Sequence, residues 1–124
     1  GLIFPDHQFC RDGGMTAAMM VFILASTGKK ISTLIHALPN RYIIKDKIRS
    51  SNGEHILESL KRVYSHDLQD LTDGVKIFHG QSWALVRASG TEPIIRIIVD
   101  ADNKDSCEGF HKELMSHILK ITPA

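Results

Sequence analysis

The chain has 124 residues, enough for one ordinary domain and part of another, with the 43% hydrophobic and 23% charged residues of a soluble globular protein. Its formal net charge is +1 and its lysines and arginines are dispersed, which argues against a nucleic-acid-binding or anionic-membrane surface. The first residues lack the basic start and long apolar core of a secretory signal, so we expect a cytoplasmic protein.

The first third of the chain predicts a short strand and loop over residues 1–9, followed by a strongly apolar helix. Asp12 is placed to cap a helix from about Gly13 to Ser26, and Gly28 to end it. Residues 17–25 are nine consecutive apolar residues, about half of a membrane span. A helix that is apolar on all sides is normally buried on more than one side.

A shorter helix is predicted over residues 31–38, and Pro39-Asn40 ends it. The pattern then changes from helical to alternating, which is typical of a domain boundary with a hinge. We therefore expect residues 1–38 to be the end of an upstream domain and residues 39–124 to form a domain of their own.

The second domain reads as strand, helix, three strands and helix. The strands are expected over 41–49, 75–78, 83–87 and 94–100, and the first helix over 53–65, capped by 50–52. Asp102 and Asn103 offer caps for the last helix, which has one apolar stripe from Cys107 to Ile121. This pattern predicts an α+β fold, in which an antiparallel sheet of about four strands carries two helices on one face.

The most informative stretch is the polar loop between the last two predicted strands, Arg-Ala-Ser-Gly-Thr-Glu-Pro at residues 87–93. Ser89 and Thr91 offer hydroxyls on either side of Gly90, where backbone N–H groups can approach an anion closely. The planar guanidinium of Arg87 can donate two parallel hydrogen bonds to phosphate oxygens. Arg96 is a lone charge in an apolar strand. An ordinary hairpin turn with solvent-exposed arginines fits the same residues, whereas a P-loop does not.

These seven residues, followed by Arg96, closely resemble the C-terminal phosphate-binding signature of the α-D-phosphohexomutases, a family that includes phosphomannomutase, phosphoglucomutase and phosphoglucosamine mutase. A second stretch, residues 3–18, looks like the segment after the sugar-binding loop of that family. The resemblance covers nearly the whole chain but only the last part of a full-length mutase.

The resemblance implies a function for the loop. Arg87, Ser89, Gly90 and Thr91 match residues that hold the non-reacting phosphate of a hexose phosphate, and Arg96 matches with less direct support. The family's phosphoserine, its magnesium loop and its sugar-binding loop have no counterpart here. We therefore expect no catalytic residue, a magnesium ion bound upstream of this fragment and no mutase activity from the fragment alone.

The positions of the histidines and cysteines in the sequence argue against other kinds of functional site. The seven histidines show no metal-ligand pattern with Cys, Asp or Glu, and Cys10 and Cys107 are expected to be reduced and at least half-buried. A stand-alone module that binds phosphorylated ligands without catalysis is the alternative function. Because a fragment would leave the apolar helix uncovered, we expect self-association through residues 1–38.

Overall fold

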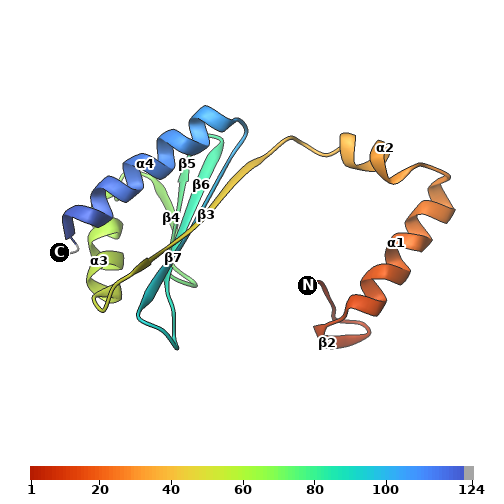
Figure 1. The fold of residues 1–124 in the computed structure, drawn as a ribbon, viewed down its shortest axis with the longest axis horizontal. Helices are drawn as coiled ribbons and strands as arrows, with labels where there is room; N and C mark the ends of the chain where they lie inside the picture. The colour runs from red at the N-terminus through yellow and green to blue at the C-terminus, as the bar shows by residue number, and fades with distance from the viewer. Residues whose placement is uncertain (122–124) are drawn as a thin grey trace. The chain divides into compact units, whose positions relative to one another are not determined.

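The computed structural model describes residues 1–121. They form two compact units, one from Gly1 to Pro39 and one from Asn40 onward (Figure 1). The first unit has a two-stranded sheet and two helices, and the second has a larger antiparallel sheet and two helices. The expected α+β class is confirmed.

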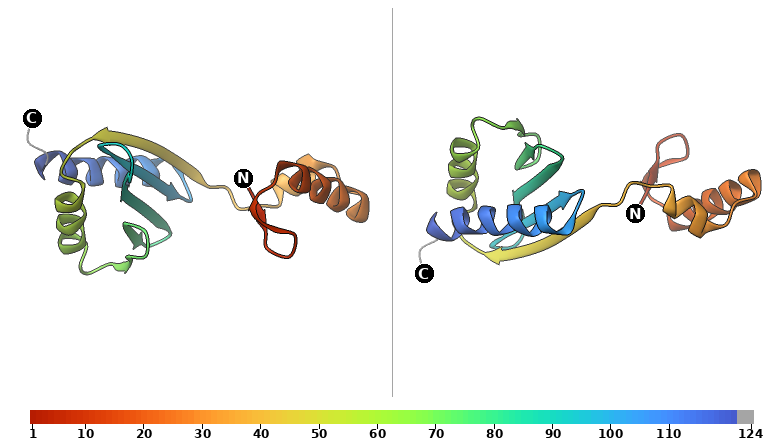
Figure 2. Two further views of the ribbon diagram at one scale, coloured as in Figure 1. Left: turned by 90° about the horizontal axis from the view of Figure 1, so that it is seen from below. Right: turned by 90° about the horizontal axis from the view of Figure 1, so that it is seen from above.

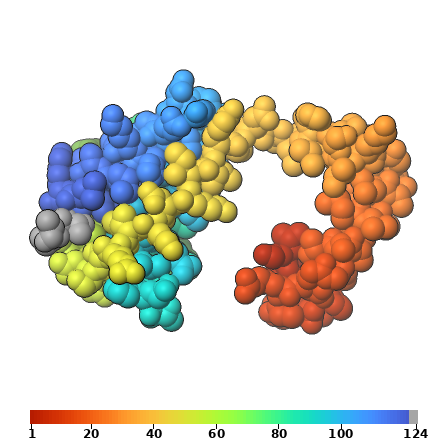
Figure 3. Space-filling model, in the orientation of Figure 1, coloured from red at the N-terminus to blue at the C-terminus, as the bar shows by residue number. Residues whose placement is uncertain are grey.

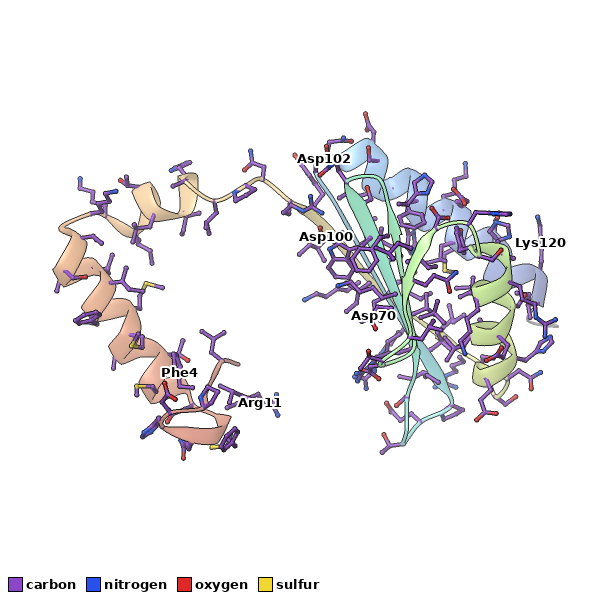
Figure 4. All side chains as sticks on the ribbon, turned by 180° about the vertical axis from the view of Figure 1, so that it is seen from behind. Phe4, Arg11, Asp70, Asp100, Asp102 and Lys120 are labelled. Atoms are coloured by element: carbon purple, nitrogen blue, oxygen red, sulfur yellow. The ribbon has the colours of Figure 1, made fainter. Side chains whose placement is uncertain are left out.

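The first unit begins with a small hairpin in which β1 (Ile3–Phe4) pairs antiparallel with β2 (Gln8–Arg11). Phe4 and Arg11, labelled in Figure 4, lie on the two strands of this hairpin. The sequence predicted one short strand and a loop here, so β2 is a strand that the sequence did not predict. Its four exposed residues show no apolar alternation that could have indicated a strand.

Both predicted caps of α1 (Gly13–Thr27) are confirmed. Asp12 Oδ1 accepts a hydrogen bond of 2.8 Å from the backbone N–H of Met15. At the other end Gly28 has φ +63 and donates its N–H to the carbonyl of Leu24. The second helix, α2 (Ile31–His36), ends before the expected residue 38. Within the described residues, neither helix contains a buried side chain.

The sheet of the second unit has five strands in the order β3-β7-β6-β5-β4, all antiparallel. Their bounds are β3 (Tyr42–Arg49), β4 (Leu68–Asp70), β5 (Val75–His79), β6 (Ser82–Ala88) and β7 (Ile94–Ala101). The expectation of about four strands is therefore corrected, because β4 was not predicted. Only one of its three residues is apolar, and that residue, Leu68, is 72% exposed.

Hydrogen bonds rather than apolar burial hold β4 at the edge of the sheet. Gln69 at its centre donates its side-chain N–H groups to the carbonyls of Lys61 and Tyr64 at the end of α3 (Gly53–Val63). The bond to Lys61 satisfies a carbonyl that the last turn of a helix leaves unpaired, whereas the Tyr64 carbonyl also accepts from the backbone N–H of Asp67. The start of α3 also differs from the expectation, because the side chain of Asn52 forms no capping bond and Ser50 Oγ accepts from Asn52 N–H instead.

One face of the sheet is covered by α3 and α4 (Lys104–Ile121), as the two further views in Figure 2 also show. The side chains at every second strand position point to this face and form the core with the helices. The fully buried members include Val75, Ile77, Val86, Ile95, Ile97, Leu60, Leu114 and Ile118. Among residues 40–121, no helix lies on the opposite face. No helix within residues 1–121 is both long and apolar enough to cross a membrane.

Candidate anion-binding site

The predicted loop connects β6 to β7 at one end of the sheet. Its base is closed by a hydrogen bond of 2.9 Å from Ser89 N–H to the carbonyl of Ile94. Further along, Ile94 N–H donates to the carbonyl of Glu92 at 2.8 Å. Within the described part of the chain, Gly90 and Thr91 form no hydrogen bond. These amides therefore remain available to an anion.

The two arginines of the signature are brought together by the pairing of β6 with β7. Arg87 and Arg96 lie directly opposite each other in the register, so both side chains are on the face opposite the helices. Directly opposed residues on one face have Cβ atoms about 5 Å apart. Leu85 and Ile98, the next pair along the same face, line a small pocket of about 160 Å3 together with the arginines.

Each arginine has an acidic neighbour. Arg87 Nη1 donates to Asp73 Oδ2 at 2.6 Å, and Arg96 Nη2 lies 3.9 Å from Glu92 Oε2. The Asp73 and Glu92 side chains are 69% and 61% exposed, so water screens both carboxylates. The arginine side chains are 41% and 49% exposed and can be reached by a ligand.

The position of Asp73 depends on the turn between β4 and β5. Asp70 Oδ1 accepts from both the backbone N–H and the hydroxyl of Thr72, which lowers the pKa of Asp70. Gly74 follows with φ +88, and a Cβ there would lie 2.3 Å from the carbonyl oxygen of Val86. Only glycine fits so close to β6, and this contact brings Asp73 beside Arg87.

Two depressions flank the loop, and their charges differ. The first, about 600 Å3, is lined by the loop and by residues 50–55 at the start of α3, where Gly53 packs against Ala88. It contains no arginine or lysine. The second, about 630 Å3, lies on the face opposite the helices and is lined by three cations, Lys45, Lys47 and Arg96, and by two acidic residues, Asp46 and Glu92. The Asp46 carboxylate is engaged by His111 of α4, at 3.0 Å between Oδ2 and Nε2. An anion is therefore favoured electrostatically on this second side.

Sequence reasoning identified the loop residues but not all of their neighbours. In the sequence, Asp73-Gly74 has only the pattern of a turn, and Lys45, Lys47 and Arg49 alternate with other residues as on the solvent side of a strand. The missing information was the pairing of strands, because Lys47 lies directly opposite Arg96 in the β3–β7 register. The alternation of β3 was the available signal, but it does not tell which strand lies beside it.

No described group of three or more His, Cys, Asp or Glu side chains is arranged to hold a metal ion. Both cysteines are free, as expected. Cys107 is buried and its burial raises the pKa of the thiol, whereas Cys10 is exposed, contrary to the expectation of burial. Cys10 lies on the exposed strand β2, where no element of the first unit covers it.

Two family models match the chain. One, described as the C-terminal domain of phosphoglucomutase/phosphomannomutase, matches residues 23–117. The other, described as the alpha/beta/alpha domain III of the same enzymes, matches residues 1–42. Together they cover both units.

Curated relatives agree with these models. The chain is 43% identical over 114 residues to a phosphoglucomutase/phosphomannomutase of Thermococcus kodakarensis, covering 89% of this chain and 25% of the relative. It is 39% identical over 119 residues to a phosphoglucosamine/phosphogalactosamine mutase of Sulfurisphaera tokodaii, covering 92% and 26%. A probable phosphoglucosamine mutase of Methanopyrus kandleri is 31% identical over 123 residues, covering 95% and 27%. The chain thus spans about a quarter of the length of these relatives.

Proposed function

The chain belongs to the phosphoglucomutase/phosphomannomutase family, and from this premise we propose that it holds the non-reacting phosphate of a hexose phosphate in a phosphohexomutase. Residues 1–38 are then the end of the third, sugar-binding domain, and residues 39–124 are the phosphate-binding domain. The observation that carries the proposal is the pairing of Arg87 with Arg96 next to a loop with free amides.

The chemistry follows from this arrangement. A phosphate monoester is a dianion with three terminal oxygens, so it can accept from both guanidinium groups and from the amides of Gly90 and Thr91 at once. The Ser89 and Thr91 hydroxyls supply further donors. Such charge-assisted bonds contribute roughly 1.5–3 kcal/mol each, less where water screens them.

Holding the phosphate at one end of the sugar fixes the position of the other end. Binding energy from a part of the substrate that does not react thereby lowers the barrier to phosphoryl transfer elsewhere. The residues described here take no part in the bond changes themselves. By the family resemblance, magnesium would supply its charge to the transferring phosphoryl group from a part of the enzyme outside this chain.

The stand-alone phosphate-binding module remains the alternative, and it would use the same arginines. The mutase is favoured because α1 exposes side chains that a complete small module would cover, among them Val21 at 66% and Phe22 at 64%. We therefore propose that the 124-residue chain binds hexose phosphates but does not interconvert them.

An NMR titration of the 15N-labelled chain tests this proposal. Hexose 6-phosphate and inorganic phosphate are expected to shift the amide resonances of Ser89, Gly90 and Thr91, whereas the unphosphorylated hexose is not. A coupled assay for sugar 1-phosphate is run on the same sample and is expected to show no turnover. The proposal is wrong if the loop amides do not respond to phosphate, or if the chain alone is an active mutase.

A further inference from the structure

The two arginines are part of a longer row of cations. Lys47 of β3 lies directly opposite Arg96 of β7, and Arg96 lies directly opposite Arg87 of β6. These three side chains therefore stand next to one another across three neighbouring strands, all on the face opposite the helices. In Figure 3, β3 (yellow) lies along the surface of the second unit.

Such a row opposes folding, because like charges directly opposite each other on a sheet destabilise it. Arg87 and Arg96 each have a carboxylate nearby, Asp73 and Glu92. The ammonium of Lys47, in contrast, pairs with no carboxylate among residues 1–121, although its side chain is exposed. The positive charge of the row is therefore only partly neutralised, and the least neutralised member is Lys47.

The surface next to Lys47 is shaped to receive a ligand. Lys47 and Arg96 line the depression of about 630 Å3 on this face, and Ile94 and Ile98 form apolar parts of its wall. The other charged residues that line it are Lys45, Asp46 and Glu92. Glu92 and Ile94 line both this depression and the one beside Ser89, so a phosphate held by the loop and by Arg96 would lie where the two depressions meet. One strand spacing, about 4.8 Å, separates β3 from β7, which a lysine side chain spans easily.

We propose that Lys47 is a third cationic ligand of the phosphate monoester, so that the binding site extends from the loop across β7 onto β3. The inference rests on the proposed function, because the anion is the phosphate of the hexose phosphate that the loop binds. Lys47 contacts this phosphate from the side opposite Arg87.

A simpler role for Lys47 would be to protect the sheet edge. β3 is an edge strand, and lysines on edge strands hinder pairing with other chains. Lys45 shares the strand, the face and the exposure of Lys47 and lines the same depression, but it lies opposite Ile98, two residues further along β7 from the loop than Arg96. An edge-protecting role would apply equally to both lysines, so Lys45 is the matched control.

The experiment compares Lys47→Met with Lys45→Met in the 124-residue chain. Methionine keeps the aliphatic stem and removes the charge. The dissociation constants of inorganic phosphate and of hexose 6-phosphate are measured from the shift of the Gly90 amide resonance. We expect Lys47→Met to weaken both by about fivefold and Lys45→Met by less than about twofold, and Lys47→Arg to restore most of the loss.

The unfolding temperature, measured with and without phosphate, distinguishes a phosphate ligand from a lysine with a purely structural role. Without ligand, Lys47→Met is expected to unfold at the same or a slightly higher temperature, because a like charge beside Arg96 is removed. With saturating phosphate, its stabilisation is expected to be smaller than that of the wild type.

The outcomes separate this inference from the function on which it rests. If the wild-type loop does not bind phosphate, the proposed function and the role of Lys47 are both wrong. If the wild type binds phosphate and Lys47→Met binds equally well, or if the two methionine variants lose affinity to the same extent, only the role of Lys47 is overturned.

Discussion

Asp73 and Arg87 are joined by a hydrogen bond of 2.6 Å between Oδ2 and Nη1, although they are fourteen residues apart in the sequence. The turn before β5 and the end of β6 are held together here by Gly74, which packs against the backbone of Val86 and Arg87. The guanidinium of Arg87 is thus oriented by a second loop before any ligand arrives.

Replacement of Gly74 by alanine is expected to disrupt this contact. A Cβ at φ +88 would lie 2.3 Å from the Val86 carbonyl oxygen and 2.8 Å from Arg87 Cβ, so the turn must move. We expect a loss of about 3 kcal/mol in the free energy of unfolding, measured in urea by the fluorescence of Trp83. Gly80→Ala is the control, with φ +59 and nothing within 4 Å, and is expected to cost about 1 kcal/mol. Equal losses would contradict the argument from close approach.

Arg87→Ala is expected to weaken the binding of hexose 6-phosphate by about tenfold. The lower end of the range for charge-assisted bonds, about 1.5 kcal/mol, applies because the side chain is 41% exposed. Arg87→Lys is expected to restore only part of this affinity, since an ammonium cannot form the two parallel bonds of a guanidinium. Calorimetric titration measures both, with the exposed Arg62→Ala as control. Unchanged affinity in Arg87→Ala would remove this residue from the site.

Arg41 neutralises a buried carboxylate at the far end of β7. Asp100, labelled in Figure 4, is 6% exposed, and Arg41 Nε donates to its Oδ1 at 2.6 Å while Nη2 donates to the same oxygen. Arg41→Met leaves this carboxylate buried without its counter-ion, and we expect a loss of about 2 kcal/mol in the free energy of unfolding. Arg62→Met, with no buried partner, is expected to cost less than about 0.5 kcal/mol.

The double variant Arg41→Met/Asp100→Asn is the further check on this pair. Because the uncompensated charge is then gone, it is expected to be more stable than Arg41→Met alone. An additive loss in the double variant would mean that the two residues act independently.

The cap of α1 is expected to depend on pH through Asp12. The hydrogen bond from Met15 N–H lowers the pKa of Asp12 below its ordinary value of 3.8 in the folded state. The stability that the charged cap provides is therefore fully present above pH 3.8 and is lost as the pH falls through the lower folded-state pKa. The amide resonance of Met15 and the helical circular dichroism signal are expected to follow this loss.

Asp12→Asn is the matched control for this titration. Asparagine caps a helix about as well as aspartate but carries no charge, so α1 should persist while the acidic transition of the Met15 amide disappears. The same transition in Asp12→Asn would show that another group is responsible.

We propose that the chain self-associates through residues 1–38. Exposed apolar side chains are frequent in this unit, including Phe9 at 86%, Val21 at 66% and Phe22 at 64%. Burial of about 400 Å2 of apolar surface would contribute about 10 kcal/mol before the entropic cost of association. Light scattering is expected to show dimers or larger species at micromolar concentration. Phe22→Ser should shift them toward monomer, and Val63→Ser in the second unit should not. A monomeric wild type would contradict the proposal.

Local patterns in the sequence were sufficient for most of the elements. The caps of α1 could be predicted because Asp12 and Gly28 act on backbone groups a few residues away. The alternation of β3 and the apolar stripe of α4 were equally visible, since each needs only its own period of two or 3.6 residues. The loop at 87–93 was found in the same way, as a short polar segment between two strands.

Contacts between distant segments were decided by the tertiary structure alone. β4 has too few apolar residues to predict, and it is held by Gln69 against the end of α3. Asp73 reaches Arg87 only because β5 pairs with β6. Lys47 joins the row of cations only because β3, the first strand of the unit, pairs with β7, the last. The alternation within a strand determines which side chains share a face, but the neighbouring strand is selected by the burial of the whole core, which no local pattern encodes.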